Sequence, residues 1–172
     1  MENSGKLTFR KATSEDEAEV WQILQQAIIR RKNEGSKQWQ DGYPNPETIK
    51  NDIDDELGYV LTESEKMIGY AAVIINNEPA YDEIEGKWLT NGDFIVVHRV
   101  AIADEAAGKG YATKIFGFIE KWAIQNRIFS IKVDTNFDNR AMLKILDKLG
   151  YKYCGEVYFR GAARKAFEKV LK

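Results

Sequence analysis

The sequence predicts an α/β fold: a central mixed, mostly antiparallel sheet of about seven strands, flanked by about four helices. Hairpin-like strand pairs lie near both ends of the chain, and between them short apolar strands alternate with amphipathic helices. The chain shows no internal repeat. With 172 residues, 44% of them hydrophobic, and three prolines, residues 1–172 are expected to form a single domain around one core.

The amino-terminal half predicts two helices and three strands. Ser14 and Glu17 have the spacing of a capping box, which predicts a helix start at this point. Trp39 and Tyr43 fall in an irregular loop between the two helices. The expected elements are a strand over 7–12, a helix from Ser14, a second helix over 47–57 and hairpin strands over 58–62 and 67–75.

The carboxyl-terminal half is more regular. Apolar residues recur at helical spacing on the stripe of Ala112, Ile115, Phe116, Ile119 and Ala123. Gly150 is expected to end the following helix in a left-handed conformation. Short crossovers predict that neighbouring strands are parallel here. The expected elements are strand 94–102, a glycine turn, a helix to Asn126, strand 128–135, helix 139–149 and a hairpin over 151–171.

Composition and charge limit the classes of protein to consider. The net charge of −2 argues against a general nucleic-acid binder, and no apolar stretch approaches the ~18 residues of a membrane span, so a soluble cytoplasmic protein without a membrane partner is expected. A single cysteine and a single histidine predict no disulfide and no metal site. Residues 1–93 carry 10 basic and 19 acidic side chains, and residues 94–172 carry 15 and 8. This asymmetry fits either solvated faces or an anionic ligand on the carboxyl-terminal half and a cationic one on the amino-terminal half.

The glycine turn before the helix that ends at Asn126 is a candidate phosphate site. A buried strand, the glycines Gly108 and Gly110 and then a helix aim free backbone N–H groups at one point, and such groups bind anions. A plain tight turn is the alternative. Tyr111 after Gly110 excludes a P-loop, and Thr113 stands where a dinucleotide fingerprint requires glycine.

Residues 94–151 resemble the GNAT superfamily of acetyl-CoA-dependent N-acetyltransferases. The family's cofactor motif, Arg/Gln-x-x-Gly-x-Gly/Ala, matches Ala107-Gly108-Lys109-Gly110-Tyr111-Ala112 at every position except the first. Asn139-Arg140-Ala141, running to Lys148-Leu149-Gly150-Tyr151, resembles a second family segment. This segment is a helix that begins with asparagine and ends in Leu/Lys-Leu-Gly-Phe/Tyr. The remaining elements follow the family's order, so that the resemblance extends over nearly the whole chain.

The resemblance implies a cofactor site for acetyl-CoA. Main-chain groups of Val100, Ala101 and Ile102 are expected to bind the pantetheine arm, and Asn136 and Asn139 to contact the cofactor from beyond the next strand. On local sequence, a helix cap is an equal interpretation of Asn139. The diphosphate is expected to bind at Gly108, Lys109, Gly110, Tyr111, Ala112 and Thr113.

The expected chemistry is direct attack of an amine on the thioester in a ternary complex. Similar enzymes often use a glutamate as base, and His98 occupies that position, where an imidazole can accept a proton at neutral pH. A core histidine is the alternative. Leu146 replaces the family's usual proton-donating tyrosine, which leaves Tyr111, Tyr153, Tyr158 or water. Cys154 is interpreted as a small core side chain.

The acceptor is expected to bind among the irregular segments. Trp39, Tyr43 and Trp88 are predicted to line its pocket, together with Tyr81, and Asp82, Glu83 or Glu85 to attract an ammonium group. A small-molecule or amino-acid-like primary amine is favoured. A protein N-terminus or lysine as acceptor, and a noncatalytic acyl-CoA sensor, are the alternatives, and a homodimer paired through an edge strand is expected.

Overall fold

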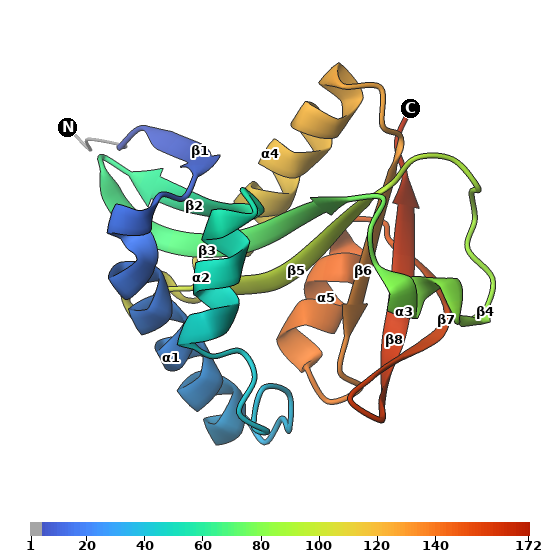
Figure 1. Cartoon of the computed structure of the whole chain (residues 1–172), viewed down its shortest axis with the longest axis horizontal. Helices are drawn as coiled ribbons and strands as arrows, with labels where there is room; N and C mark the ends of the chain where they lie inside the picture. Colours follow the sequence, from blue (N-terminus) through green and yellow to red (C-terminus); the bar gives the residue numbers. More distant parts are fainter. Residues whose placement is uncertain (1–4) are drawn as a thin grey trace.

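One eight-stranded sheet organises the chain in a computed structural model that describes residues 5–172, so that residues 1–4 lie outside the description. The strand order is β1-β2-β3-β5-β6-β8-β7-β4, with helices on both faces (Figure 1). The elements are β1 (Leu7–Lys11), η1 (Ser14–Asp16), α1 (Glu17–Asn33), α2 (Pro46–Asp54), β2 (Gly58–Glu63), β3 (Lys66–Ile75), α3 (Pro79–Asp82), β4 (Glu85–Gly86), β5 (Ile95–Ile102), η2 (Asp104–Ala106), α4 (Tyr111–Gln125), β6 (Ser130–Thr135), α5 (Arg140–Lys148), β7 (Lys152–Phe159) and β8 (Ala162–Val170).

The mixed, mostly antiparallel sheet is confirmed, because β5 and β6 are its parallel pair and the other neighbours run antiparallel. The additional strand and helix relative to the prediction are β4, of two residues, and α3, of four. Both fall in the polar segment of residues 76–93, which has too few periodic positions to predict an element. Residues 5–172 contain no helix with the length and hydropathy that a bilayer crossing requires.

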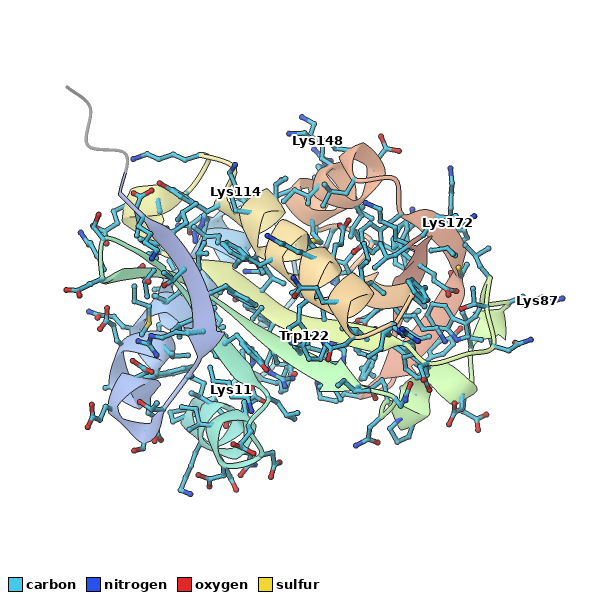
Figure 2. All side chains as sticks on the ribbon, turned by 90° about the horizontal axis from the view of Figure 1, so that it is seen from above. Lys11, Lys87, Lys114, Trp122, Lys148 and Lys172 are labelled. Carbon is cyan, nitrogen blue, oxygen red and sulfur yellow. The ribbon has the colours of Figure 1, made fainter. Side chains whose placement is uncertain are left out.

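The two faces of the sheet are covered by different helices. Apolar side chains of α1 and α2 pack with Val60 and Tyr70 on one face. The predicted stripe of α4 is buried on the other, where Ile115, Phe116 and Ile119 share a cluster with α5. Lys114 and Trp122 mark the two ends of α4 in Figure 2. Each amphipathic helix therefore removes its apolar stripe from water against the sheet.

Strand order corrects one prediction. The crossovers predicted that successive strands are parallel neighbours, but β8 lies between β6 and β7 and pairs antiparallel with both. The β7–β8 hairpin thus folds its second strand into the sheet, an arrangement that crossover length does not specify.

The start of the first helix also differs from the prediction. The capping box is formed one residue earlier, by Thr13 and Asp16, and the first turn is the 3₁₀ turn η1. The carboxylate of Asp16 accepts from the Thr13 N–H at 2.8 Å, and Arg10 of β1 donates to the same carboxylate at 2.8 and 3.0 Å. This contact between β1 and the helix start fixes the cap, and sequence spacing alone does not reveal it.

A gap opens between the two parallel strands. β5 and β6 pair only through Ile95 with Ile131 and Val96 with Lys132, and from there they diverge (Figure 1). The edge of β5 that faces β6 is consequently unpaired over residues 97–102. Backbone N–H and C=O groups on such an edge need other partners.

A bulge in β5 accompanies this divergence. The register shifts opposite Tyr70 and Ala72, and Arg99 takes a left-handed φ of 55°. Neighbouring residues of a regular strand point to opposite faces, whereas here His98 and Arg99 both line one polar cavity. The bulge therefore brings two consecutive polar side chains to the same side of the sheet.

A buried ion pair connects this bulge to α2. Arg99 donates from Nε and Nη2 to the two carboxylate oxygens of Asp52, at 2.8 and 2.6 Å. The Tyr70 hydroxyl donates to the same carboxylate at 2.6 Å, and the pKa of Tyr70 is raised by burial and then by the charge of Asp52. A two-pronged geometry of this kind holds the guanidinium in one orientation.

Asp52→Asn is expected to lower the free energy of unfolding by about 3 to 5 kcal/mol, because it leaves the buried Arg99 guanidinium without its counter-ion. Urea denaturation followed by circular dichroism measures the loss. Asp54→Asn is the matched control, since Asp54 lies on the same helix in an exposed pair with Lys50 and its loss should leave stability unchanged. Equal stability of the two variants would contradict this prediction.

Candidate active site

A long groove lies where β5 leaves β6. It has a volume of about 490 Å³ and runs between the end of α1, the start of α4 and the length of α5. Most of the positions predicted for the cofactor lie together on its wall. These are Val100, Ala101, Ile102, Gly108, Gly110, Tyr111, Ala112, Thr113 and Asn139.

The glycine turn has the geometry of an anion site. Gly108 and Gly110 have φ of 76° and 81°, values that favour glycine, and a Cβ at either position would meet no protein atom within 4 Å. Gly110 is the N-cap of α4, its N–H groups have no side-chain cap, and the first turn contains no acidic residue. Uncapped amides at a positive helix end, beside glycines with open space where a Cβ would stand, fit a diphosphate group.

Two predicted cofactor positions are absent from this wall. Lys109 is exposed at the tip of the turn. The Asn136 N–H donates to the side-chain Oε1 of Gln38 at 3.2 Å, and the Asn136 side chain donates to Asp138 at 3.0 Å. Asn136 therefore holds the loop after α1 rather than facing the groove.

Asn139 has structural contacts of its own. Its side-chain oxygen accepts from the Met142 N–H at 3.2 Å, which caps α5, and its amide donates to Gln38 at 2.8 Å. The helix-cap interpretation thus has its hydrogen bonds in the structure. Contact between Asn139 and a cofactor stays a prediction, supported by its place on the groove wall.

Two arginines of α1 occupy the unpaired edge of β5, and sequence reasoning missed them. Arg30 donates to the Ile102 carbonyl at 2.6 and 3.1 Å, and Arg31 donates to the Val100 carbonyl at 3.3 Å. Burial, followed by the charge of Arg30, lowers the pKa of Arg31 to about 10. Both arginines belong to the acidic half of the chain, so the groove's positive charge is not confined to the carboxyl-terminal half. No local pattern distinguishes them from an ordinary basic helix end.

A smaller polar cavity opens beside the groove. Its volume is about 40 Å³, and the charged side chains on its wall are Arg31, Arg99, Asp134 and Arg164, with His98 beside them. The cavity and the groove share four lining residues, which are Arg31, Val100, Asn139 and Met142. A group held in the polar cavity therefore lies next to a group held in the groove.

His98 lies between two acids, of which Asp134 lines the cavity and Glu78 does not. Its Nε2 lies 2.6 Å from Glu78 and its Nδ1 lies 3.7 Å from Asp134, which accepts from the Tyr81 hydroxyl at 2.6 Å. Burial alone would raise the pKa of Glu78, but the hydrogen bond and charge of His98 outweigh it, and the pKa lies below its ordinary value of 4.5. Burial, followed by the charge of Asp134, raises the pKa of Tyr81 well above its usual range.

The acids beside His98 differ from those predicted. Asp82, Glu83 and Glu85 are exposed and line neither cavity. Glu78 lies 20 residues before His98 in sequence, and nothing local marks it. Asp134 offers a weak signal, because it lies near the carboxyl end of a parallel strand, where α/β proteins place their ligands.

Two of the three predicted acceptor residues line the polar cavity, namely Trp39 and Tyr43. Trp39 is buried beneath Arg31, whose guanidinium carbon lies 3.8 Å from the ring centroid. Trp88 lines neither cavity. Its Nε1–H donates to the Tyr81 carbonyl at 2.9 Å and its ring packs on Tyr81, so it supports the far side of the site.

The proton-donor candidates are not equivalent. Tyr111 lines the groove, but its hydroxyl donates to Glu63 at 2.8 Å. Tyr153 and Tyr158 line neither cavity. Leu146, at the position where the family usually has tyrosine, is fully buried in the core, and Cys154 is also buried.

Comparisons with known proteins agree with this fold. The family model described as "Acetyltransferase (GNAT) family" matches residues 17–151. A crystal structure of a GNAT-family acetyltransferase from Streptococcus agalactiae is 34% identical, with a TM-score of 0.87 and coverage of 96% of each chain. One from Listeria monocytogenes has a TM-score of 0.77 over 96% of this chain and 95% of the other, and at 17% identity it supports the fold alone. No curated protein matches the chain.

The chain therefore belongs to the GNAT family of acetyltransferases, as its resemblance over residues 94–151 indicated. It is an acyltransferase by family, with a candidate active site where the groove and the polar cavity meet.

Proposed function

We propose that the protein is an N-acetyltransferase that transfers an acetyl group from acetyl-CoA to a primary amine of a small molecule, by direct attack in a ternary complex. The observation that carries the proposal is the shared wall of the two cavities. One cavity has free helix amides suited to a diphosphate, and the other has a histidine held by carboxylates. Neighbouring sites of these two kinds hold an amine and a thioester next to each other. Positioning two reactants in this way lowers the barrier to their reaction.

The groove supplies the cofactor site in this proposal. Acetyl-CoA, when bound, provides the acetyl thioester. Gly108 and Gly110 admit the diphosphate close to the main chain, and the first N–H groups of α4 bind it. The carbonyls of Val100 and Ile102 already accept from arginines, so the N–H groups of the same two residues, on the same strand edge, are those left for the pantetheine arm.

His98 is the proton acceptor in this proposal. Because Glu78 is ionised at neutral pH, Nε2 carries the hydrogen that it accepts, and Nδ1 keeps its lone pair on the side of Asp134. The 3.7 Å between Nδ1 and the Asp134 oxygen is too long for a hydrogen bond. A nitrogen about 2.9 Å from both atoms would bridge them, which suits an incoming ammonium group. His98 then takes a proton from this ammonium group, which leaves a neutral, nucleophilic amine.

A small acceptor is favoured over a protein tail by the size of the polar cavity, about 40 Å³. Tyr43 is a further candidate for protonating the thiolate, since this residue lines the cavity and its hydroxyl accepts from Arg99, which leaves the hydroxyl hydrogen free to donate.

The test is a titration of the purified protein with acetyl-CoA and a panel of amines, with free thiol and product mass recorded together. Thiol release that depends on an amine, with a product heavier by one acetyl group, supports the proposal. Cofactor binding without thiol release would instead support an acyl-CoA sensor. Turnover of lysine-bearing peptides without any small amine would identify a protein acceptor.

Glu78→Gln is expected to lower kcat about tenfold and to leave the KM for acetyl-CoA unchanged, because Glu78 orients His98 and does not line the groove. Steady-state kinetics measure both constants. Glu83→Gln is the matched control, since Glu83 is an exposed glutamate of the same segment, and should leave both constants unchanged. A rise in KM without a fall in kcat would contradict a role in orienting the base.

The same variant should change the pH dependence of stability. The lowered pKa of Glu78 means that its ionised form stabilises the fold above about pH 4.5 and that this contribution is lost as the pH falls through the lowered value. The free energy of unfolding of the wild type should therefore fall toward that of Glu78→Gln between neutral pH and pH 3. A constant difference across this range would contradict the ion pair.

A further inference from the structure

Arg164 of β8 is a buried cation that finds few hydrogen-bond partners and little opposite charge among the described residues. It is 7% exposed and lies on the wall of the polar cavity. Its guanidinium makes no hydrogen bond with any residue of the described range 5–172, and its Nε is shielded from solvent with no partner. The nearest carboxylate is Asp134, 3.7 Å from Nη1, and the guanidinium also lies 5.5 Å from the Phe159 ring centroid.

The contrast with Arg99 on the same cavity wall is informative. Arg99 is satisfied by Asp52 and Tyr43, through three hydrogen bonds. Arg164 shares the single carboxylate of Asp134 with His98 and Tyr81. Removing a charge from water is costly unless hydrogen bonds and an opposite charge replace the solvent, so the cavity at Arg164 favours an anion that supplies both.

We propose that the acceptor carries a carboxylate close to its amine, and that Arg164 binds this carboxylate in the polar cavity. The inference rests on the proposed N-acetyltransferase function and specifies its substrate class. The amine binds between His98 and Asp134, and the carboxylate binds on the other side of Asp134, at Arg164. Because one side chain separates the two subsites, only a few bonds separate amine and carboxylate, as in an α- or β-amino acid.

The size of the cavity agrees with such an acceptor. About 10 to 15 Å³ of this kind of volume holds one water-sized group, so 40 Å³ holds about three or four. The amine nitrogen, α-carbon and carboxylate of an α-amino acid are five bonded non-hydrogen atoms, which lie closer together than four separate water-sized groups. A guanidinium also matches a carboxylate with two parallel hydrogen bonds, and Arg164 has its donors free to make them.

The experiment compares acceptors in matched pairs. Each of the common amino acids is tested with acetyl-CoA beside the amine that lacks its carboxylate, such as phenylalanine beside phenethylamine and alanine beside ethylamine. Aminoalkylphosphonates form a third arm, in which a phosphonate replaces the carboxylate. The wild type should turn over at least one amino acid with a kcat/KM about 10²-fold above that of its matched amine and of its phosphonate.

Arg164→Gln should remove this preference. Its kcat/KM for the amino acid should fall about 10²-fold, whereas kcat/KM for the matched amine stays unchanged. Arg164→Lys, which keeps the charge but not the two-pronged geometry, should give an intermediate loss, and it serves as the test if the glutamine variant does not fold. Arg127→Gln, a change at an exposed arginine beyond the end of α4, is the matched control and should keep the wild-type preference.

The outcomes separate the two proposals. If simple amines are acetylated as efficiently as amino acids, or if Arg164→Gln lowers the rate for both members of a pair equally, the carboxylate subsite is wrong and the acetyltransferase function stands. A higher kcat/KM for phosphonates than for amino acids would also contradict the proposed carboxylate subsite. If no amine of any arm releases thiol while acetyl-CoA binds, the proposed function itself is wrong, and the acceptor subsite with it.

Discussion

Gly110→Asp is expected to abolish acetyl-CoA binding. The variant places a carboxylate at the N-cap of α4, where the helix end is positive and the diphosphate is proposed to bind. Acetyl-CoA at 100 times its dissociation constant should stabilise the wild type by about 2.7 kcal/mol. This corresponds to a melting-temperature rise of roughly 5 to 10 °C for a chain of this length. Gly110→Asp should show no rise in the same differential scanning experiment.

Gly110→Asn is the matched control, because asparagine has the same shape, has no charge, and tolerates the left-handed φ of 81° better than most residues. It should keep a reduced but measurable rise, since open space in front of Gly110 accommodates a Cβ. If the aspartate and asparagine variants lost binding equally, backbone strain rather than charge would be the cause. A full rise with Gly110→Asp would place the diphosphate elsewhere.

His98→Ala is expected to lower kcat by about 10² to 10⁴-fold at neutral pH, which is the usual contribution of a general base. The melting-temperature rise with acetyl-CoA should remain, because His98 lines the polar cavity and not the groove. Stopped assays of thiol release measure the first quantity and scanning calorimetry the second.

Added imidazole provides the control for His98→Ala. It should restore part of the lost rate, because the variant vacates the volume of the ring beside Glu78 and Asp134. Rescue by imidazole separates a missing base from a damaged fold. An unchanged kcat in His98→Ala would show that another group or water takes the proton.

The order of the main helices and strands and the glycine turn before α4 could be predicted from the sequence. Alternation, helical stripes and glycine positions are local patterns, and each is fixed by the geometry of one element. The stripe of Ile115, Phe116 and Ile119 is buried as expected. Gly108 and Gly110 have the left-handed backbone that their placement between a strand and a helix indicated.

The acceptor side of the site could be predicted only in part. Trp39 and Tyr43, predicted for an acceptor pocket, and His98, predicted as the base, line one polar cavity, whereas Trp88 lies outside it and donates to the Tyr81 carbonyl. Their roles stay predictions. Glu78 and Asp134 were missed because their relation to His98 depends on which strands are neighbours. The insertion of β8 between β6 and β7, which brings Arg164 to Asp134, was likewise not contained in any local pattern.

The sequence by itself determined the family, the main helices and strands and the glycine turn, because each depends on residues close together along the chain. Tertiary structure alone decided which charged side chains meet at the polar cavity. Burial and hydrogen-bond or charge partners set the energy of an ionised side chain. That the Arg164 guanidinium is buried with few such partners can be recognised only from the positions of all the groups around it.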